Sequence, residues 1–421
     1  MLRPLLGALG VSLALAVAAS AQETSPPAPA AQFRAVSAAA VSAANERKLH
    51  AAFDFLYNLD FQPALQLFEE VSREEPESAA AMAFWSSALL YEILAHQGSL
   101  QSQLFVASNE FLRFPRLPID PKLDARYHSV TDEAEARAKR RIKKNPDDVD
   151  GLFALGLLYG TEANYLAGVK AEYFRGVRLG EKADDIHSKL RAAHPEIHDT
   201  GVVLGVRQYV IGILPRTTRF FLFFVGARGS KDRGLEYLRE VAERGEYLRT
   251  YAKVLISVAA IRDKDFDTAV SIGEELVRRY PRNPIFRLEL ARGYRDSQRY
   301  DAATRLARDL LADLIAHPHN PRVVGPEDAL LELGLIEAGQ GKLDLALESL
   351  RRVGIFPGAS KHAQADAMLE RGKILDARGQ REQAVAEYEK VIRLSANPAS
   401  VRAAESYRKR PYQPGEDKPS S

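Results

Sequence analysis

A pattern of small residues recurs about every 34 residues along much of this chain. One position holds glycine or alanine and a second position, twelve residues later, holds alanine; the members are Gly156, Ala291, Gly334 and Gly372 at the first position and Ala64, Ala269, Ala303, Ala346 and Ala384 at the second. A period of this length is typical of proteins built from repeated supersecondary units. Because one such unit cannot bury its apolar face alone, neighbouring units are expected to stack.

The residue types at these positions predict two antiparallel helices in each unit. A small residue lets the first helix approach the second closely, and bulky residues fill the seam between units. A proline such as Pro281 ends the second helix. The recurring order, for example Leu155-Gly156 followed by Tyr159, resembles the tetratricopeptide repeat. The resemblance implies an all-α fold, a solenoid of helical hairpins wound as a right-handed superhelix.

The repeat spacing breaks in two proline-containing segments. The interval from Ala303 to Ala346 is 43 residues, which places an insertion in the loop 316–326. Residues 113–122 hold three prolines and interrupt the register. We therefore expect N-terminal hairpins of the same repeat type at 41–112 and a longer repeat superhelix with insertions at 113–406.

The two ends of the chain differ from the repeats. Residues 1–21 combine Arg3, an apolar run and a small-residue cleavage site, which predicts a secretory signal peptide. The run is shorter than a bilayer span requires. Export to the periplasm or cell envelope is therefore expected. Residues 22–40 are predicted to be a flexible linker, and residues 407–421 a disordered tail.

Composition narrows the possible functions. The chain has 58 Lys and Arg residues against 56 Asp and Glu residues, a net charge of +2, which supplies no overall field for nucleic acid or an anionic membrane. No nucleic-acid partner is therefore expected. The absence of cysteine excludes a thiolate zinc site, a CxxC redox pair and a thiol nucleophile.

Residues 209–224 form the most apolar stretch after the signal peptide. With the Val225 to Leu235 segment that follows, the stretch resembles part of the family containing tetratricopeptide repeat protein 39 and the yeast inclusion-clearance proteins, over roughly residues 201–311. That resemblance implies a multi-repeat scaffold and no catalytic residue. Two interpretations stay open: a buried core helix pair, or a lipid contact through Phe220, Phe221, Phe223 and Phe224.

A search for catalytic or metal-binding residues finds no complete arrangement. Gly339-Gln340-Gly341-Lys342 lacks the remaining residues of a phosphate-binding loop. His187, His194 and His198 lie close in sequence, but Pro195 separates the last two, so one helix cannot present them as a zinc pair. We expect these histidines to be solvated. The sequence predicts a protein that is not an enzyme and needs no cofactor or metal.

In such a solenoid the first helices of the repeats form the wall of a concave groove. Mapping the groove positions onto this chain gives Tyr251, Arg262, Leu288, Arg292, Arg295 and Lys373. These residues would form a basic strip beside apolar steps, which suits an extended or helical peptide with acidic groups. The sequence therefore predicts an exported scaffold that binds a protein or peptide partner in this groove. The alternative is a membrane- or lipid-associated protein that uses residues 209–224.

Overall fold

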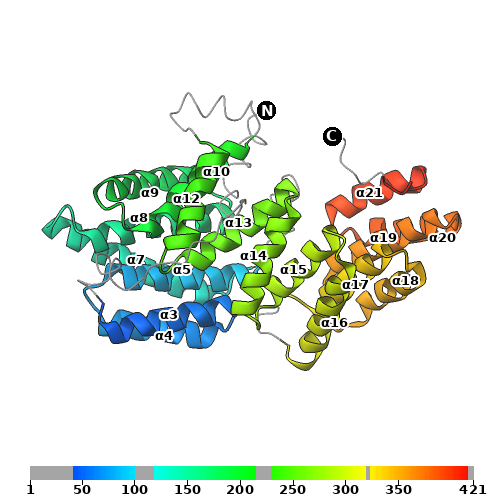
Figure 1. Ribbon diagram of the computed structural model, residues 1–421, viewed down its shortest axis with the longest axis horizontal. Coiled ribbons are helices and arrows are strands. Elements are labelled where there is room, and N and C mark those ends of the chain that lie inside the picture. The colour runs from blue at the N-terminus through cyan, green and yellow to red at the C-terminus, as the bar shows by residue number, and fades with distance from the viewer. Residues whose placement is uncertain (1–40, 101–117, 215–228, 319–322, 416–421) are drawn as a thin grey trace. The chain divides into compact units, whose positions relative to one another are not determined.

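The computed structural model describes residues 41–100, 118–214, 229–318 and 323–415. All regular structure in these ranges is helical, without a β-strand (Figure 1). The predicted all-α helical-repeat fold is therefore confirmed. The predicted signal peptide, the linker 22–40 and the four phenylalanines at 220, 221, 223 and 224 lie outside the described residues.

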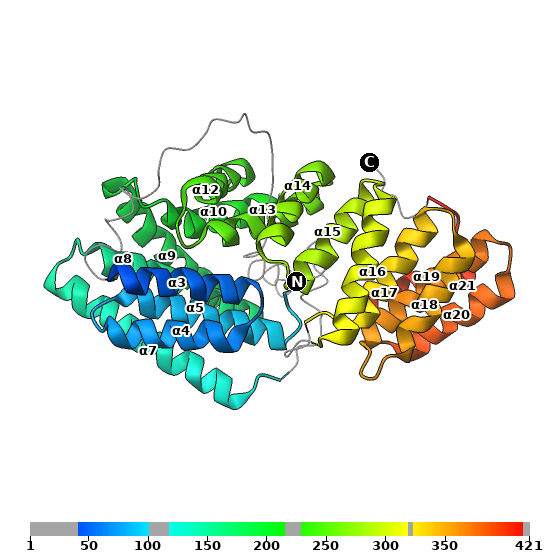
Figure 2. The same ribbon diagram turned by 60° about the horizontal axis from the view of Figure 1, so that its bottom comes forward.

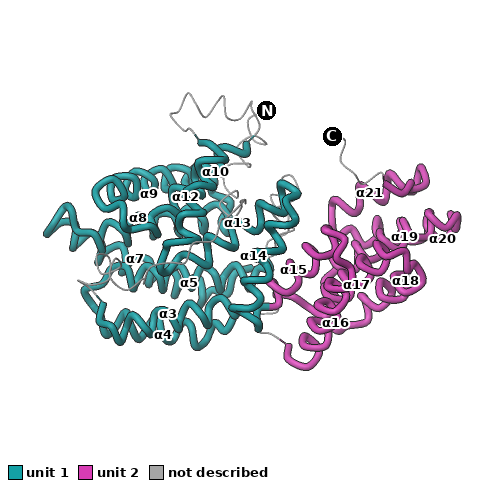
Figure 3. The backbone as a smooth tube through the Cα atoms, in the orientation of Figure 1, with its two compact units in different colours: residues 1–283 teal, residues 284–421 magenta. Residues whose placement is uncertain are grey.

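The chain divides into two compact units, residues 1–283 and residues 284–421 (Figure 3). The helices of unit 1 are α3 (Ala43–Tyr57), α4 (Phe61–Glu74), α5 (Ala79–His96), α7 (Pro121–Lys144), α8 (Val149–Asn164), α9 (Tyr173–Ala193), α10 (Gly201–Ile213), α12 (Lys231–Arg244), α13 (Arg249–Asp263) and α14 (Phe266–Arg279). A π-helical turn, η3 (Tyr165–Val169), follows α8, and a short 3-10 turn, η4 (His198–Thr200), precedes α10.

Unit 2 consists of three helical hairpins and one further helix. They are α15 (Pro284–Asp296) with α16 (Tyr300–Ala316), α17 (Pro326–Gly339) with α18 (Leu343–Arg352), α19 (Lys361–Ala377) with α20 (Arg381–Leu394), and α21 (Pro398–Lys409). The 3-10 turn η5 (Val353–Ile355) follows α18. The predicted insertion lies where expected, between the end of α16 and the start of α17. The first helices α15, α17, α19 and α21 contact one another in sequence.

The helix ends follow the local sequence. Helix α5 begins after Ser78, whose hydroxyl accepts the Ala81 N–H at 3.2 Å, and α8 begins after Asp148, whose carboxylate accepts the Gly151 N–H at 2.8 Å. Proline occupies the start of α7, α17 and α21, where the missing N–H has no partner to lose. Helix α10 stops at Ile213 because the residue before Pro215 is held in an extended conformation.

The repeat glycines lie where helices approach closely. A Cβ atom on Gly156 would overlap the ring of His187 on α9, and one on Gly372 would overlap the ring of Tyr388 on α20. On Gly334 it would lie 2.7 Å from Leu350 Cγ of α18. The predicted role of these small residues, close packing within each hairpin, is therefore confirmed.

The first hairpins of unit 1 pack against its last helices. Tyr247, in the turn before α13, lies with its ring centroid 4.8 Å from that of Phe84 of α5 and 5.8 Å from that of Phe53 of α3. Figure 2 shows the ribbons of α3, α5 and α13. At the end of the unit, Asn283 Nδ2 donates to the Tyr57 carbonyl at 2.7 Å. These contacts join segments about 200 residues apart, so the predicted boundary near residue 113 does not separate two domains.

Candidate binding surface

The first helices of unit 2 carry charged side chains on a shared face. We call this face the first-helix surface, and it comprises Glu289, Arg292 and Arg295 of α15, Glu332 of α17, and Asp366, Glu370, Lys373 and Asp376 of α19. Asp366 links α19 to the next helix, because it accepts hydrogen bonds from Asn397 Nδ2 at 2.7 Å and Ser400 Oγ at 2.5 Å. Ion pairs and hydrogen bonds thus join each repeat to the next.

The positive charges of Arg292 and Arg295 are compensated by carboxylates of the protein itself. Glu332 is 1% exposed and lies 2.7 Å from Arg295 Nη1 and 3.7 Å from Arg292 Nε. Burial raises the pKa of Glu332. Burial alone would lower the pKa of Arg295, but the carboxylates of Glu332 and Asp296 raise it above its ordinary value. These guanidinium groups therefore support the surface more than they offer positive charge to a ligand.

The end of α21 packs beside α20, and Tyr412, which follows it, lies on the last part of this surface. The Tyr412 N–H donates to Asp376 Oδ2 at 2.9 Å, and the Lys373 ammonium lies 5.4 Å from the centroid of the Tyr412 ring. Arg381 donates to the carbonyls of Tyr407 and Arg408 at 2.8 Å each. The Tyr407 and Tyr412 rings meet edge to face at 5.2 Å between centroids.

The predicted disordered tail 407–421 therefore needs correction for its first part. Helix α21 continues to Lys409, and Tyr407 packs on Tyr388 with 5.8 Å between ring centroids. The charged and proline-rich composition suggested disorder, but two tyrosines supply enough apolar area to hold the segment on α19 and α20. Residues 416–421 lie outside the described residues.

The remaining predicted groove residues differ in position. Leu288 of α15 is fully buried, and Arg292 is 7% exposed. Tyr251 and Arg262 belong to unit 1, on α13, where Tyr251 lines a cavity. Leu288 therefore supports the first-helix surface from beneath, because its side chain has no area available to a ligand.

The three clustered histidines do not converge. His187 is fully buried and stacked on Phe153, with Nε2 3.0 Å from the Phe153 carbonyl, and burial lowers its pKa to about 4. His198 instead faces Glu240, and His194 faces Glu196. The expectation that His187 is solvated is wrong, because its ring fills the space that Gly156 leaves. Within the described ranges, no group of three or more potential ligands is placed to hold a metal ion.

Two residues that shape this surface were not identified from the sequence. Glu332 lies in the middle of α17 within the run Leu330-Leu331-Glu332-Leu333, and an acid inside such an apolar run is a usable signal for a buried ion pair. Tyr412 lies beyond the last repeat, where periodicity gives no information. The only sequence signal for Tyr412 is the presence of aromatic residues within a charged segment.

Comparison with known proteins supports the repeat assignment in unit 2. Tetratricopeptide repeat family models match residues 288–360 and 365–398. These matches do not support the narrower resemblance at 201–311, which stays a prediction. No curated protein sequence matches the chain significantly.

Solved structures with the same kind of fold are distant. The crystal structure of yeast Tom70 has 11% identity and a TM-score of 0.35, with 84% of this chain and 86% of that chain covered. The human IFIT1 dimer with m7Gppp-AAAA has 12% identity and a TM-score of 0.42, with 97% and 90% covered. The IFIT1 monomeric mutant with Gppp-AAAA has 13% identity, a TM-score of 0.41, and 88% and 86% coverage.

Proposed function

We propose that the protein is an exported, non-catalytic scaffold that binds an extended segment of another protein on the first-helix surface of unit 2. Tetratricopeptide repeats at 288–360 and 365–398 support a protein-binding role. The observation that carries the proposal is the position of Tyr412, which follows α21 and contacts Asp376 and Lys373 of this surface as a residue of a bound peptide would. A partner segment takes the place of the residues that follow Arg410.

The contacts of residues 407–412 suggest what such a partner offers. Asp376 is 1% exposed and accepts from Arg381, the Tyr388 hydroxyl and the Tyr412 N–H, so a backbone N–H completes its hydrogen bonds. Lys373 pairs with Glu370 and also faces an aromatic ring. An extended segment with one aromatic residue can satisfy both sites.

The proposed partner segment differs from the acidic peptide expected from the sequence. Arg292 and Arg295 face Glu289, Glu332 and Asp296, so the positive charge of the strip is largely compensated. An aromatic residue and a free backbone N–H therefore matter more for the partner than acidic groups.

Removing the competing segment is expected to strengthen peptide binding. We expect a chain that ends at Arg410 to bind a fluorescent peptide of residues 411–415 about tenfold more tightly than the complete chain does, because a tethered competitor acts at high effective concentration. Fluorescence anisotropy measures both affinities. Helix α21 ends at Lys409, so the truncation leaves every described helix intact.

Two variants of the truncated chain serve as test and control. Lys373→Ala removes the contact with the aromatic ring and should weaken peptide binding about threefold. Lys342 is an exposed lysine before α18, and Lys342→Ala should leave the peptide affinity unchanged. Equal affinities for the truncated and complete chains would count against the proposal.

Export, lipid contact and the absence of a nucleic-acid partner are further parts of the proposal. Export predicts that the mature protein begins at Gln22, which mass spectrometry of the intact protein can test. Among the described helices, none combines the length and apolar character needed to cross a bilayer. The alternative of lipid contact depends on Phe220, Phe221, Phe223 and Phe224, which lie outside the described residues. The nearly balanced net charge predicts no nucleic-acid partner.

A further inference from the structure

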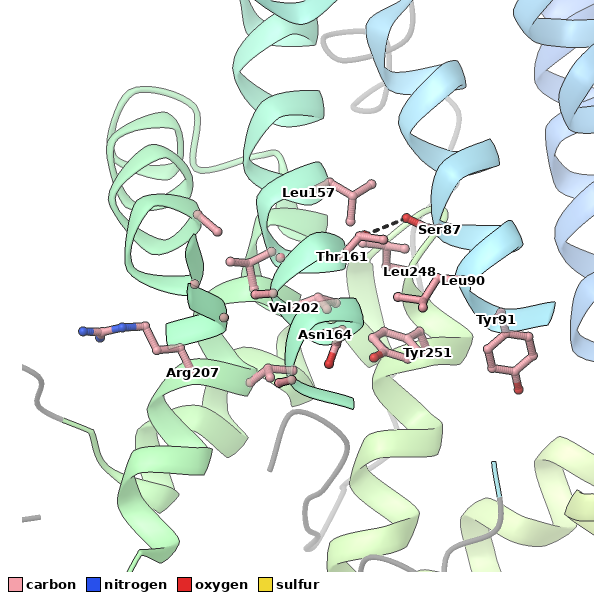
Figure 4. A pocket seen from close by; sticks show the side chains of 18 of the residues that line it. Ser87, Leu90, Tyr91, Leu157, Thr161, Asn164, Val202, Arg207, Leu248 and Tyr251 are labelled. Carbon is pink, nitrogen blue, oxygen red and sulfur yellow. Dashed lines mark hydrogen bonds between the residues drawn. The ribbon is translucent and has the colours of Figure 1, made fainter. Parts of the chain in front are cut away.

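Unit 1 contains a cavity of about 180 Å³ that no proposed role of unit 2 requires. Helices α3, α5, α8, α9, α10 and α13 and the turn η3 surround it (Figure 4). The cavity lies between α3 and α5 on one side and the later helices of the unit on the other, and it is partly open to solvent. Phe53 of α3 and Leu248 at the start of α13 both belong to its wall.

Small residues on the surrounding helices keep the cavity open. A Cβ atom on Gly160 would meet only Val203 Cγ2 at 3.4 Å, and one on Gly180 only Ala163 Cβ at 4.0 Å. Ala88 and Ala183 also belong to the wall. The wall of this partly open space is largely apolar. An apolar ligand that fills the space would remove that surface from water and give the wall atoms packing partners.

The chemistry of the wall is apolar with a neutral polar group on one side. Leu90, Leu157, Val202 and Leu248 face the space, whereas Asn164 and Tyr251 lie beside each other and present a carboxamide and a phenol (Figure 4). Burial raises the pKa of Tyr251 to about 12, so the phenol stays neutral.

The hydroxyl groups of Ser87 and Thr161 already bind each other at 2.9 Å. Asn164 and Tyr251 also interact with each other, but a carboxamide and a phenol together have more donors and acceptors than one hydrogen bond uses. Asn164 and Tyr251 can therefore still orient a ligand hydroxyl.

The charged lining residues do not favour an ionic ligand. The Arg207 side chain contributes carbon atoms and directs its guanidinium away from the other labelled side chains, toward Asp184 at 3.5 Å (Figure 4). Glu181 of α9 adds a negative charge at the wall. A carboxylate ligand would be repelled, and an ammonium group would have to leave water for a largely apolar space.

We infer that this cavity binds a neutral, mainly apolar small molecule with one hydroxyl group, which is directed toward Asn164 and Tyr251. An apolar cavity of about 150 Å³ accepts benzene, so a ring or short alkyl chain somewhat larger than benzene fits this one. The inference concerns unit 1 and goes beyond the partner binding proposed for unit 2.

A head-group series on the complete chain tests the inference. Isothermal titration calorimetry with octan-1-ol, octanoate and octylamine should detect one site for the alcohol, with each charged analogue about tenfold weaker or more. The absence of heat from octan-1-ol, or octanoate binding as tightly as the alcohol, would overturn the inference. This comparison needs no substitution and does not depend on the folding of a variant.

A filled cavity gives a second test. Gly160→Leu extends a side chain into the space and should weaken octan-1-ol about tenfold or more, with the helical circular dichroism spectrum retained. Gly354→Leu, at an exposed glycine with no atom close to its Cβ position, is the matched control and should bind as the original chain does. Unchanged binding in a folded Gly160→Leu variant would contradict the assignment of the site.

Discussion

Replacing Gly156 by alanine is expected to lower the free energy of unfolding of unit 1 by about 3 kcal/mol. The new methyl group overlaps the buried ring of His187, which is stacked on Phe153 and bonded to its carbonyl. To make room, α8 and α9 must separate or the ring must give up its hydrogen bond. Either change outweighs the gain of about 1 kcal/mol in helix propensity.

The sequence holds one tryptophan, Trp85 on α5 of unit 1, so its fluorescence during urea unfolding follows this unit. Gly160→Ala, one turn further along α8, is the matched control. Its Cβ would meet Val203 Cγ2 at an ordinary 3.4 Å, so the same substitution should stabilise by up to about 1 kcal/mol. Similar effects at the two glycines would show that close approach at Gly156 is not what holds this hairpin.

Replacing Asp199 by alanine is expected to destabilise unit 1 by about 4 kcal/mol. The Asp199 carboxylate is 1% exposed and accepts the N–H groups of Glu246 at 3.1 Å, Tyr247 at 3.0 Å and Leu248 at 3.3 Å. It thereby caps α13, whose own N-cap residue, Leu248, has no side-chain acceptor. Without the carboxylate, three N–H groups in a largely buried turn lose their partner.

Asp265→Ala provides the comparison for this second substitution. Asp265 caps α14 locally, through the Thr268 N–H at 3.2 Å, and is only half-buried, so its loss should cost about 1 kcal/mol. Asp199→Asn keeps one acceptor oxygen, so its loss of stability should lie between those of Asp199→Ala and Asp265→Ala. If urea unfolding followed by Trp85 gave equal losses for Asp199→Ala and Asp265→Ala, the distant cap would contribute nothing beyond an ordinary one.

The repeat pattern was sufficient to predict the helical hairpins and their close contacts, because small residues at fixed spacing report local packing. It could not predict that Tyr247 would contact Phe53 and Phe84, since these contacts connect parts of the chain more than 160 residues apart. The extent of unit 1 and its cavity, whose wall combines α3 and α5 with α10 and α13, likewise involve helices far apart in the sequence.

The candidate surface was predictable in part. Repeat positions identified Arg295 and Lys373, but periodicity gives the face of a helix and says nothing about what neutralises a charge. Glu332 comes from the next repeat, and Tyr412 comes from beyond the last one. Both therefore changed the expected chemistry of the partner from acidic to aromatic.

Photo-crosslinking from position 373 tests most directly whether the first-helix surface of unit 2 binds another protein. In the test variant, a photoreactive residue replaces Lys373 in a chain that ends at Arg410 and keeps its N-terminal segment. In the control variant, the same photoreactive residue replaces Lys342. Both variants are produced in the native host. We predict a discrete adduct with another protein in the envelope fraction from position 373, and none from position 342. No adduct from position 373, or the same adducts from both positions, would contradict the account.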